Sequence, residues 1–170
     1  MYSKAYIEYL AHFHGDRDYF ECHEILEEYW KEADPGNKNS IWVALILLAV
    51  SCYHHRRGNF KGALRTLSKA LTLFSACRET ISGLGIDPSS FFCLLKERQS
   101  RMEKKDSFQV LDIPLNDQEL IMECTVMCKV KGFEWKSLEQ PPEDIVHRHL
   151  TRDRSDVIRE REQAIQVRKA

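Results

Sequence analysis

Residues 41–53, with the sequence Ile-Trp-Val-Ala-Leu-Ile-Leu-Leu-Ala-Val-Ser-Cys-Tyr, form the longest apolar run of the chain, and only Ser51 interrupts it. The run is too short to cross a bilayer, which takes about 20 residues, so we expect no membrane partner. It lies within a helix expected over residues 40–57, which Asn39 or Ser40 would cap. Because this helix is apolar on every side, the sequence predicts that it forms the buried centre of the fold.

The segments that flank this run have the apolar spacing of amphipathic helices. Their apolar residues recur every three or four positions, and Gly and Pro residues separate them. Helices are expected over residues 3–13, 18–33, 60–82 and 88–104, and from the capping segment 116–119 to Gly132. The apolar pattern of residues 19–30 returns in residues 60–71, as two helix–turn–helix hairpins would produce.

The composition supports one helical domain. A chain of 170 residues has the size of one domain, and seven glycines with five prolines are too few turn-forming residues for an all-β fold. We therefore predict an all-α fold, a compact helical bundle of two helix–turn–helix hairpins plus additional C-terminal helices. Residues 1–135 are expected to form the bundle and residues 136–142, with Pro141-Pro142, a linker. Residues 143–170 are expected to form one charged helix that is docked or mobile.

Charge and cysteine usage narrow the class of protein. The net charge of −1 gives no overall attraction to nucleic acid or anionic lipid. The first residues lack the pattern of a signal peptide, so we expect a cytoplasmic protein with six reduced cysteines. Cys124 and Cys128 share one helix face, where packing is a better explanation than a pair of metal ligands. His12 and His14 flank a helix end, His147 and His149 lie in the charged tail, and both pairs are expected at the surface.

One segment carries residues suited to chemistry. His23 and Glu27 are four apart and share a helix face, whereas Glu24 points about 100° away. The pattern His23-Glu24-x-x-Glu27 differs by one residue from the zinc-hydrolase pattern HExxH. If the helices over 18–33 and 40–57 are antiparallel neighbours, His54 comes within reach. Either His23, Glu27 and His54 bind a divalent metal (Zn, Mn or Fe) with Glu24 as the base, or a His–Glu hydrogen bond fixes helix packing.

These motifs resemble those of a known family. Phe20-Glu21-Cys22-His23-Glu24, Leu26-Glu27, Trp30, the apolar third helix and the segment from Tyr53-His54 to Gly62-Ala63 are similar to the family called domain of unknown function 309, which is found in bacteria and archaea. The resemblance covers about residues 10–75 and implies a small all-helical bundle. It also implies a metal-dependent hydrolase, the label that members carry, with the polar positions on His23, Glu24, Glu27 and His54. The family often has a glutamine where this chain has Leu47.

The residues support three functions in order of preference. The first is a binding or scaffold module, since residues 58–71 resemble the second helix of a tetratricopeptide unit. It would use an apolar groove or the C-terminal helix to bind a protein partner or a second copy. The second is a metal-dependent hydrolase. The third, binding of nucleic acid, requires Arg56, Arg57, Lys61, Arg65 and the arginines from 152 to 161 to converge on one surface.

Overall fold

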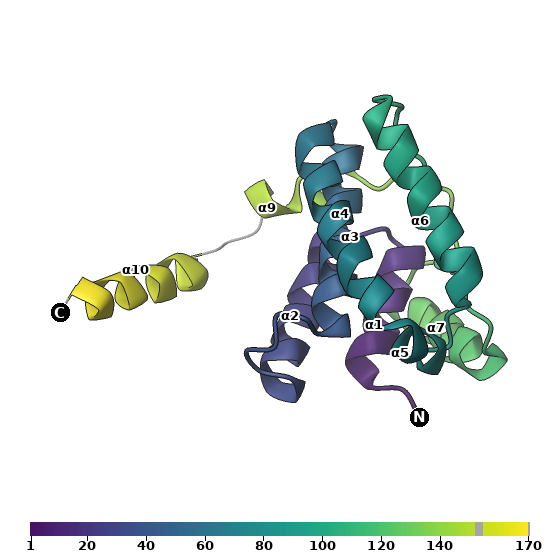
Figure 1. Ribbon diagram of the computed structural model, residues 1–170, viewed down its shortest axis with the longest axis horizontal. Helices are drawn as coiled ribbons and strands as arrows, with labels where there is room; N and C mark the ends of the chain where they lie inside the picture. The colour runs from purple at the N-terminus through teal and green to yellow at the C-terminus, as the bar shows by residue number, and fades with distance from the viewer. Residues whose placement is uncertain (152–154, 170) are drawn as a thin grey trace.

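The computed structural model describes residues 1–151 and 155–169, and in this part of the chain the fold is all-α, as predicted (Figure 1). An isolated antiparallel bridge between Ile86 and Leu115 is the one β-type pairing among the described residues. The helices are α1 (Lys4–His14), α2 (Tyr19–Ala33), α3 (Ile41–Arg56), α4 (Phe60–Ala76), α5 (Arg78–Gly83), α6 (Pro88–Glu103), α7 (Gln118–Lys131), α8 (Glu143–Val146), α9 (Arg148–Thr151) and α10 (Ser155–Lys169).

Side-chain caps begin most of the longer helices. Ser40 rather than Asn39 caps α3, and Asp18 caps α2 through a bond that its carboxylate accepts from the Glu21 backbone N–H. Such caps satisfy backbone donors that have no partner within the helix. The same device begins α1, α4, α6 and α7, at Ser3, Asn59, Asp87 and Asp117.

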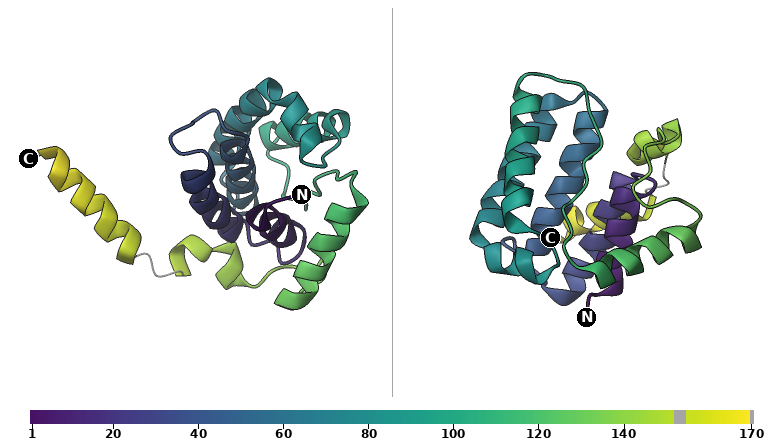
Figure 2. Two further views of the ribbon diagram at one scale, coloured as in Figure 1. Left: turned by 90° about the horizontal axis from the view of Figure 1, so that it is seen from below. Right: turned by 90° about the vertical axis from the view of Figure 1, so that its right-hand side faces the viewer.

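The helix α3 lies at the centre of the bundle, as its apolar sequence predicts. It packs against α2 on one side and α4 on the other, while α1 adds to α2 and α6 adds to α4 (Figures 1 and 2). The hairpins α1–α2 and α3–α4 are therefore both present. Leu45, Leu48 and Ala49 of α3 are almost fully buried, but Val43 and Leu47 remain partly exposed. Val43 and Leu47 line a groove on the surface of the bundle.

The cysteines are free thiols, and four of them are buried. Cys124 and Cys128 lie on the buried face of α7, and the Cys128 thiol donates to the Ala11 carbonyl of α1 at 3.5 Å. Burial raises the pKa of Cys124 to about 12 and that of Cys128 to about 11. Both thiols therefore keep their protons at neutral pH.

The helix expected over residues 60–82 is in fact two helices, and that prediction was wrong. Cys77 leaves the helical region, with φ −125° and ψ 32°, so that α4 ends at Ala76 and α5 begins at Arg78. Neither Gly nor Pro marks this position. The short α5 buries Ile81 completely. The break at Cys77 therefore results from packing against other elements, and the local spacing of apolar residues does not predict it.

The prediction of one continuous helix over residues 143–170 was also wrong, because His147 separates α8 from α9 with φ −112° and ψ 33°. Residues 152–154 and 170 of that predicted helix lie outside the described residues. His147, Arg148 and His149 each bind a group on the body. In a regular helix three consecutive side chains point about 100° apart, so they would not all reach the same surface. The division into a body, a linker and a C-terminal segment stays a prediction.

Candidate functional site

His23 and Glu27 form a partly exposed side-chain contact on α2. His23 Nε2 lies 3.0 Å from Glu27 Oε2, with the two side chains 26% and 36% exposed. Glu27 also contacts Lys31 Nζ at 3.3 Å, and Glu24 Oε1 lies 3.5 Å from His23 Nδ1. The predicted His–Glu contact is therefore present at the helix surface, in a small network of charges.

His54 lies near His23 but on a different side from Glu27. His23 and His54 line one pocket, Glu27 lines a separate groove, and Glu24 is not among the described residues that line either. Burial, with the charges of Arg57 and Arg65, lowers the pKa of His54 and favours its neutral form. Among the side chains that the structure describes, no three from His, Cys, Asp or Glu are grouped to hold a metal ion. The predicted donors therefore do not form a three-ligand set, and the metal site stays a prediction.

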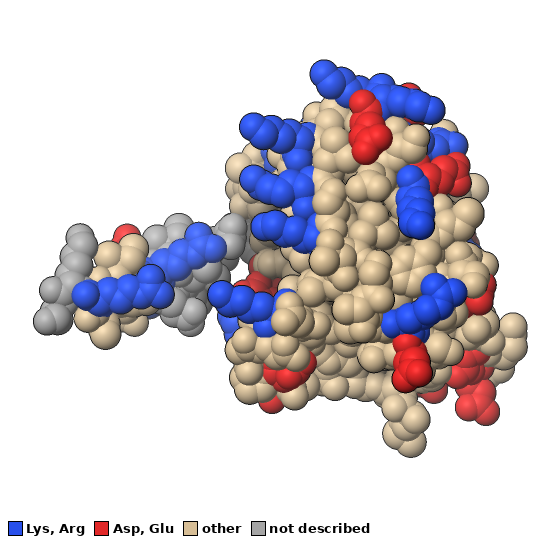
Figure 3. Space-filling model, viewed as in Figure 1, with Lys and Arg blue, Asp and Glu red and all other residues tan. Residues whose placement is uncertain are grey.

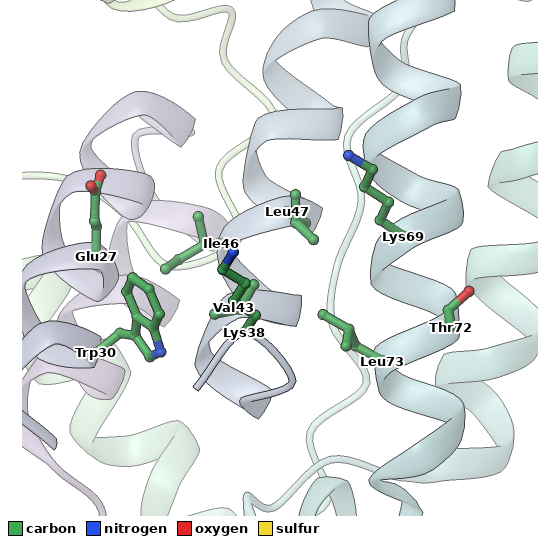
Figure 4. Close-up of a pocket in the computed structure, with 9 residues that line it drawn as sticks. All are labelled: Glu27, Trp30, Lys38, Val43, Ile46, Leu47, Lys69, Thr72 and Leu73. Atoms are coloured by element: carbon green, nitrogen blue, oxygen red, sulfur yellow. The ribbon is translucent and has the colours of Figure 1, made fainter. Parts of the chain in front are cut away.

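The groove beside Glu27 lies between α2, α3 and α4 and has a volume of about 520 Å³ (Figure 4). We call it the apolar groove. It is lined by Glu27, Trp30, Lys38, Val43, Ile46, Leu47, Lys69, Thr72 and Leu73. Trp30 and Leu73 stand on opposite sides of a floor that α3 supplies (Figure 4). The indole N–H of Trp30 donates to the Asn37 carbonyl at 3.0 Å, which fixes the ring in place.

The edge of the apolar groove is basic. Lys38 and Lys69 line it and form no ion pair with any residue that the structure describes, whereas Glu27 is already bound by His23 and Lys31. Lys61, Arg65 and Lys69 are exposed at four-residue spacing and therefore form a ridge along α4. Figure 3 shows a column of Lys and Arg side chains on this face of the body.

The second cavity, of about 270 Å³, lies where the end of α3 meets the start of α2 and the C-terminal segment. We call it the tail pocket. Its lining residues are Tyr19, Phe20, His23, Val50, Tyr53, His54, Arg57, His149 and Arg161. The His23–Glu27 pair thus lies between the two cavities, with His23 in the tail pocket and Glu27 in the apolar groove.

Three consecutive residues attach the C-terminal segment beside this pocket. Arg148 binds the buried carboxylate of Asp18 through Nε at 3.2 Å and Nη2 at 2.7 Å. Arg57 Nε donates to His147 Nδ1 at 3.0 Å, and Arg57 Nη1 lies 3.2 Å from His149 Nε2. His149 Nδ1 also bonds to the Tyr53 hydroxyl. The segment therefore forms one wall of the tail pocket.

The arginines considered for nucleic acid are not on one surface. Arg56 Nη1 donates inward to the Arg17 carbonyl at 2.7 Å, and Arg57 faces the C-terminal segment. Lys61 and Arg65 are exposed on α4. Of the arginines in the tail, those at 152 and 154 lie outside the described residues. No helix that the structure describes is long and apolar enough to cross a membrane.

A relative of this protein shares nearly the whole length of the sequence. Residues 6–66 match the profile of the family described as "Domain of unknown function (DUF309)". The uncharacterized protein YpuF of Bacillus subtilis (strain 168) is 41% identical over 173 residues, which span 99% of this chain and 98% of that protein. The chain belongs to the DUF309 family. No solved structure matches it.

Membership in DUF309 confirms the resemblance. Leu47, where that resemblance leads us to expect a glutamine, lies on the floor of the apolar groove and adds to its apolar lining.

Sequence reasoning did not find several residues of the tail pocket. Tyr19, Tyr53 and His149 come from segments far apart in the chain, and no spacing rule connects them. The adjacent basic residues at 147–149 were a visible signal. Their partners, Asp18 and Arg57, are defined only by the folded chain.

Proposed function

We propose that this DUF309 protein is a binding module whose apolar groove takes an amphipathic helix of a partner protein that carries acidic side chains. The observation that carries the proposal is the groove itself, which leaves Trp30, Val43 and Leu47 accessible between α2 and α4. Exposed apolar surface of this kind with a polar rim is typical of interaction sites.

The groove suits the anchor residues of a helix. Helix-in-groove recognition inserts apolar side chains at positions i, i+3 or i+4, and i+7 into a hydrophobic cleft. A volume of about 520 Å³ accepts a few such anchors, and the body of the partner helix would rest on the rim. Trp30 supplies an aromatic surface already held by its bond to Asn37, so little ordering is needed on binding.

The charge of the rim selects an acidic partner. Lys38 and Lys69 flank the groove without an ion pair among the described residues, and complementary charge contributes mainly to specificity and to the rate of association. The chain's own C-terminal segment is a poor match, because residues 148–170 contain seven basic and four acidic side chains. The proposed occupant is therefore a helix from a different protein.

The test compares two synthetic helical peptides of equal length that share the same Leu and Phe anchors, one with acidic and one with basic flanking residues. We expect saturable binding of the acidic peptide in a fluorescence polarisation titration, and much weaker binding of the basic one. Leu47→Gln should weaken binding of the acidic peptide roughly tenfold, because it removes apolar contact area. Lys69→Glu should weaken it as well and should narrow the difference between the two peptides.

The matched control is Val126→Gln, which makes the same kind of change at an exposed site on α7, away from the groove. It should leave the affinity unchanged. If wild type, Leu47→Gln and Lys69→Glu bind the acidic peptide equally and circular dichroism shows that all three are folded, the peptide does not bind in the apolar groove.

A further inference from the structure

We propose that the tail pocket is a binding site for a small phosphate-bearing anion, with Arg57, Tyr53 and Tyr19 as its recognition groups. The site is distinct from the apolar groove and does not depend on the function proposed for it. The cavity of about 270 Å³ has the size of a small-molecule site, and no Asp or Glu is among the described residues that line it.

The contacts of Arg57 and Tyr53 leave a hydrogen-bond donor for such a ligand. A guanidinium only donates, so neutral His149 accepts from Arg57 Nη1 at Nε2 and carries its proton on Nδ1. The Tyr53 oxygen then accepts from His149 Nδ1–H, and it also accepts from the His149 backbone N–H at 3.4 Å. Burial raises the pKa of Tyr53, which keeps its proton. That hydrogen is left to donate to a further acceptor.

Tyr19 supplies an independent observation that points to a ligand. Its side chain is fully buried, it lines the tail pocket, and its hydroxyl has no hydrogen-bond partner among the residues that the structure describes. Buried hydroxyls without a partner are rare and costly. A ligand oxygen would satisfy this hydroxyl once the side chains that cover it move aside, because the hydroxyl is closed to solvent in this structure.

The charges around the pocket favour an anion. The Arg56 guanidinium lies 4.6 Å from the centre of the Tyr19 ring, and its buried Nε and Nη2 have no partner within the described chain. The nearby carboxylate of Asp18 is bound by Arg148, and Glu24 and Glu27 contact His23. An anion in the pocket would therefore meet the positive charge of Arg57 directly, while Arg56, which lies behind Tyr19 and does not line the pocket, would act on it only at longer range.

The arrangement of donors favours a phosphate over a planar carboxylate. Tyr19 comes from the start of α2, while Tyr53 and Arg57 come from the end of α3 and its cap. Donors from different elements suit a tetrahedral group with several strong acceptor oxygens. Phe20 and Val50 supply an apolar wall, which fits the organic part of a phosphate monoester.

The test titrates the full chain with inorganic phosphate, phenyl phosphate and benzoate by isothermal calorimetry. We expect phenyl phosphate to bind most tightly if the ligand is an ester, inorganic phosphate to bind equally well if it is the free ion, and benzoate to bind least. Tyr19→Phe and Arg57→Gln should each weaken phosphate binding at least about tenfold, because each removes a donor to a charged group. Arg101→Gln, with the same loss of charge at the far end of α6, should not.

Tyr19→Phe keeps the ring and removes only an unpaired hydroxyl, so it should fold at least as well as the wild type. A loss of affinity in both Tyr19→Phe and Arg57→Gln supports the proposal. Three results would each overturn it: no saturable binding of either phosphate by the wild type, unchanged binding in Tyr19→Phe, or tighter binding of benzoate.

Discussion

At the scale of single residues, His14 shows how burial sets protonation. Its Nδ1–H donates to the Leu10 carbonyl at 2.9 Å, and its Nε2 accepts from the Ile113 backbone N–H at 2.9 Å. The ring is completely buried, and this burial lowers its pKa from 6.5 to about 4. Only the neutral imidazole can make both bonds, so the fold depends on an uncharged His14.

This pKa shift predicts acid sensitivity. Between pH 6.5 and 4 the unfolded chain binds a proton at His14 that the folded chain does not. The contribution of His14 to stability is therefore complete above pH 6.5 and declines as the pH falls toward 4, by about 3 kcal/mol in all. Urea unfolding at several pH values should show a shallower loss in His14→Gln than in the wild type. Identical pH profiles would contradict this role of His14.

The pair of His23 and Glu27 predicts a second result, on metal content. Since the described residues offer no three-ligand group, we expect elemental analysis to find no stoichiometric Zn, Mn or Fe in protein purified without a metal-binding tag. His23→Ala should have the same metal content as the wild type and lose only about 0.2–1 kcal/mol of unfolding free energy, because the contact of His23 with Glu27 is partly exposed. Stoichiometric metal that disappears in His23→Ala would restore the hydrolase alternative.

Spacing on one helix predicted the contact of His23 with Glu27, because residues four apart lie on one face whatever surrounds them. It did not predict the burial of His14, which was expected at the surface. Trp135 packs against the His14 ring, and the Ile113 backbone N–H bonds to it. Ile113 is 99 positions from His14 in the sequence, and Trp135 is farther still. Such burial depends on packing between distant segments, which local spacing does not record.

At the scale of the elements, the helix starts were predictable and two breaks were not. A capping residue acts on the backbone next to it, so the adjacent candidates Asn39 and Ser40 marked the start of α3 in the sequence, and the structure shows that Ser40 is the cap. The breaks at Cys77 and His147 have no Gly or Pro. They serve contacts with other elements, such as the attachment of Arg148 to Asp18.

That attachment should stabilise the fold measurably. Asp18 is buried and both caps α2 and binds Arg148. We expect Arg148→Ala to lower the free energy of unfolding by about 1–3 kcal/mol, as for hydrogen bonds to a buried charged group. Arg168→Ala, which removes an exposed arginine in α10, is the control and should change it little. Equal stability of the two variants in urea would show that the contact between Arg148 and Asp18 does not stabilise the fold.

At the scale of the whole molecule, the apolar groove and the tail pocket depend on different parts of the chain. The apolar groove is built from α2, α3, α4 and the loop before α3, whereas the tail pocket also needs the C-terminal segment. The sequence predicted the bundle from the amphipathic spacing of the outer helices, and its central helix from a run that is apolar on every side. It did not define the groove, which exists because Val43 and Leu47 of the apolar helix are left partly uncovered.

This division predicts the effect of a truncation. Removing residues 143–170 should leave binding of the acidic peptide within about twofold, since none of the groove residues is lost. A titration of both forms with the same peptide makes the comparison. If the shortened protein no longer binds the peptide although it remains folded, the C-terminal segment and not the groove would be the binding element.

The most direct test of the proposed function observes the groove itself. The chain has three tryptophans, and Trp30 lines the groove while Trp42 packs on Tyr6 and Trp135 on His14. In a nitrogen–proton NMR titration with the acidic helical peptide, the indole signal of Trp30 should shift saturably while those of Trp42 and Trp135 stay in place. A peptide that binds without moving the Trp30 signal, or no binding at all, would contradict the account.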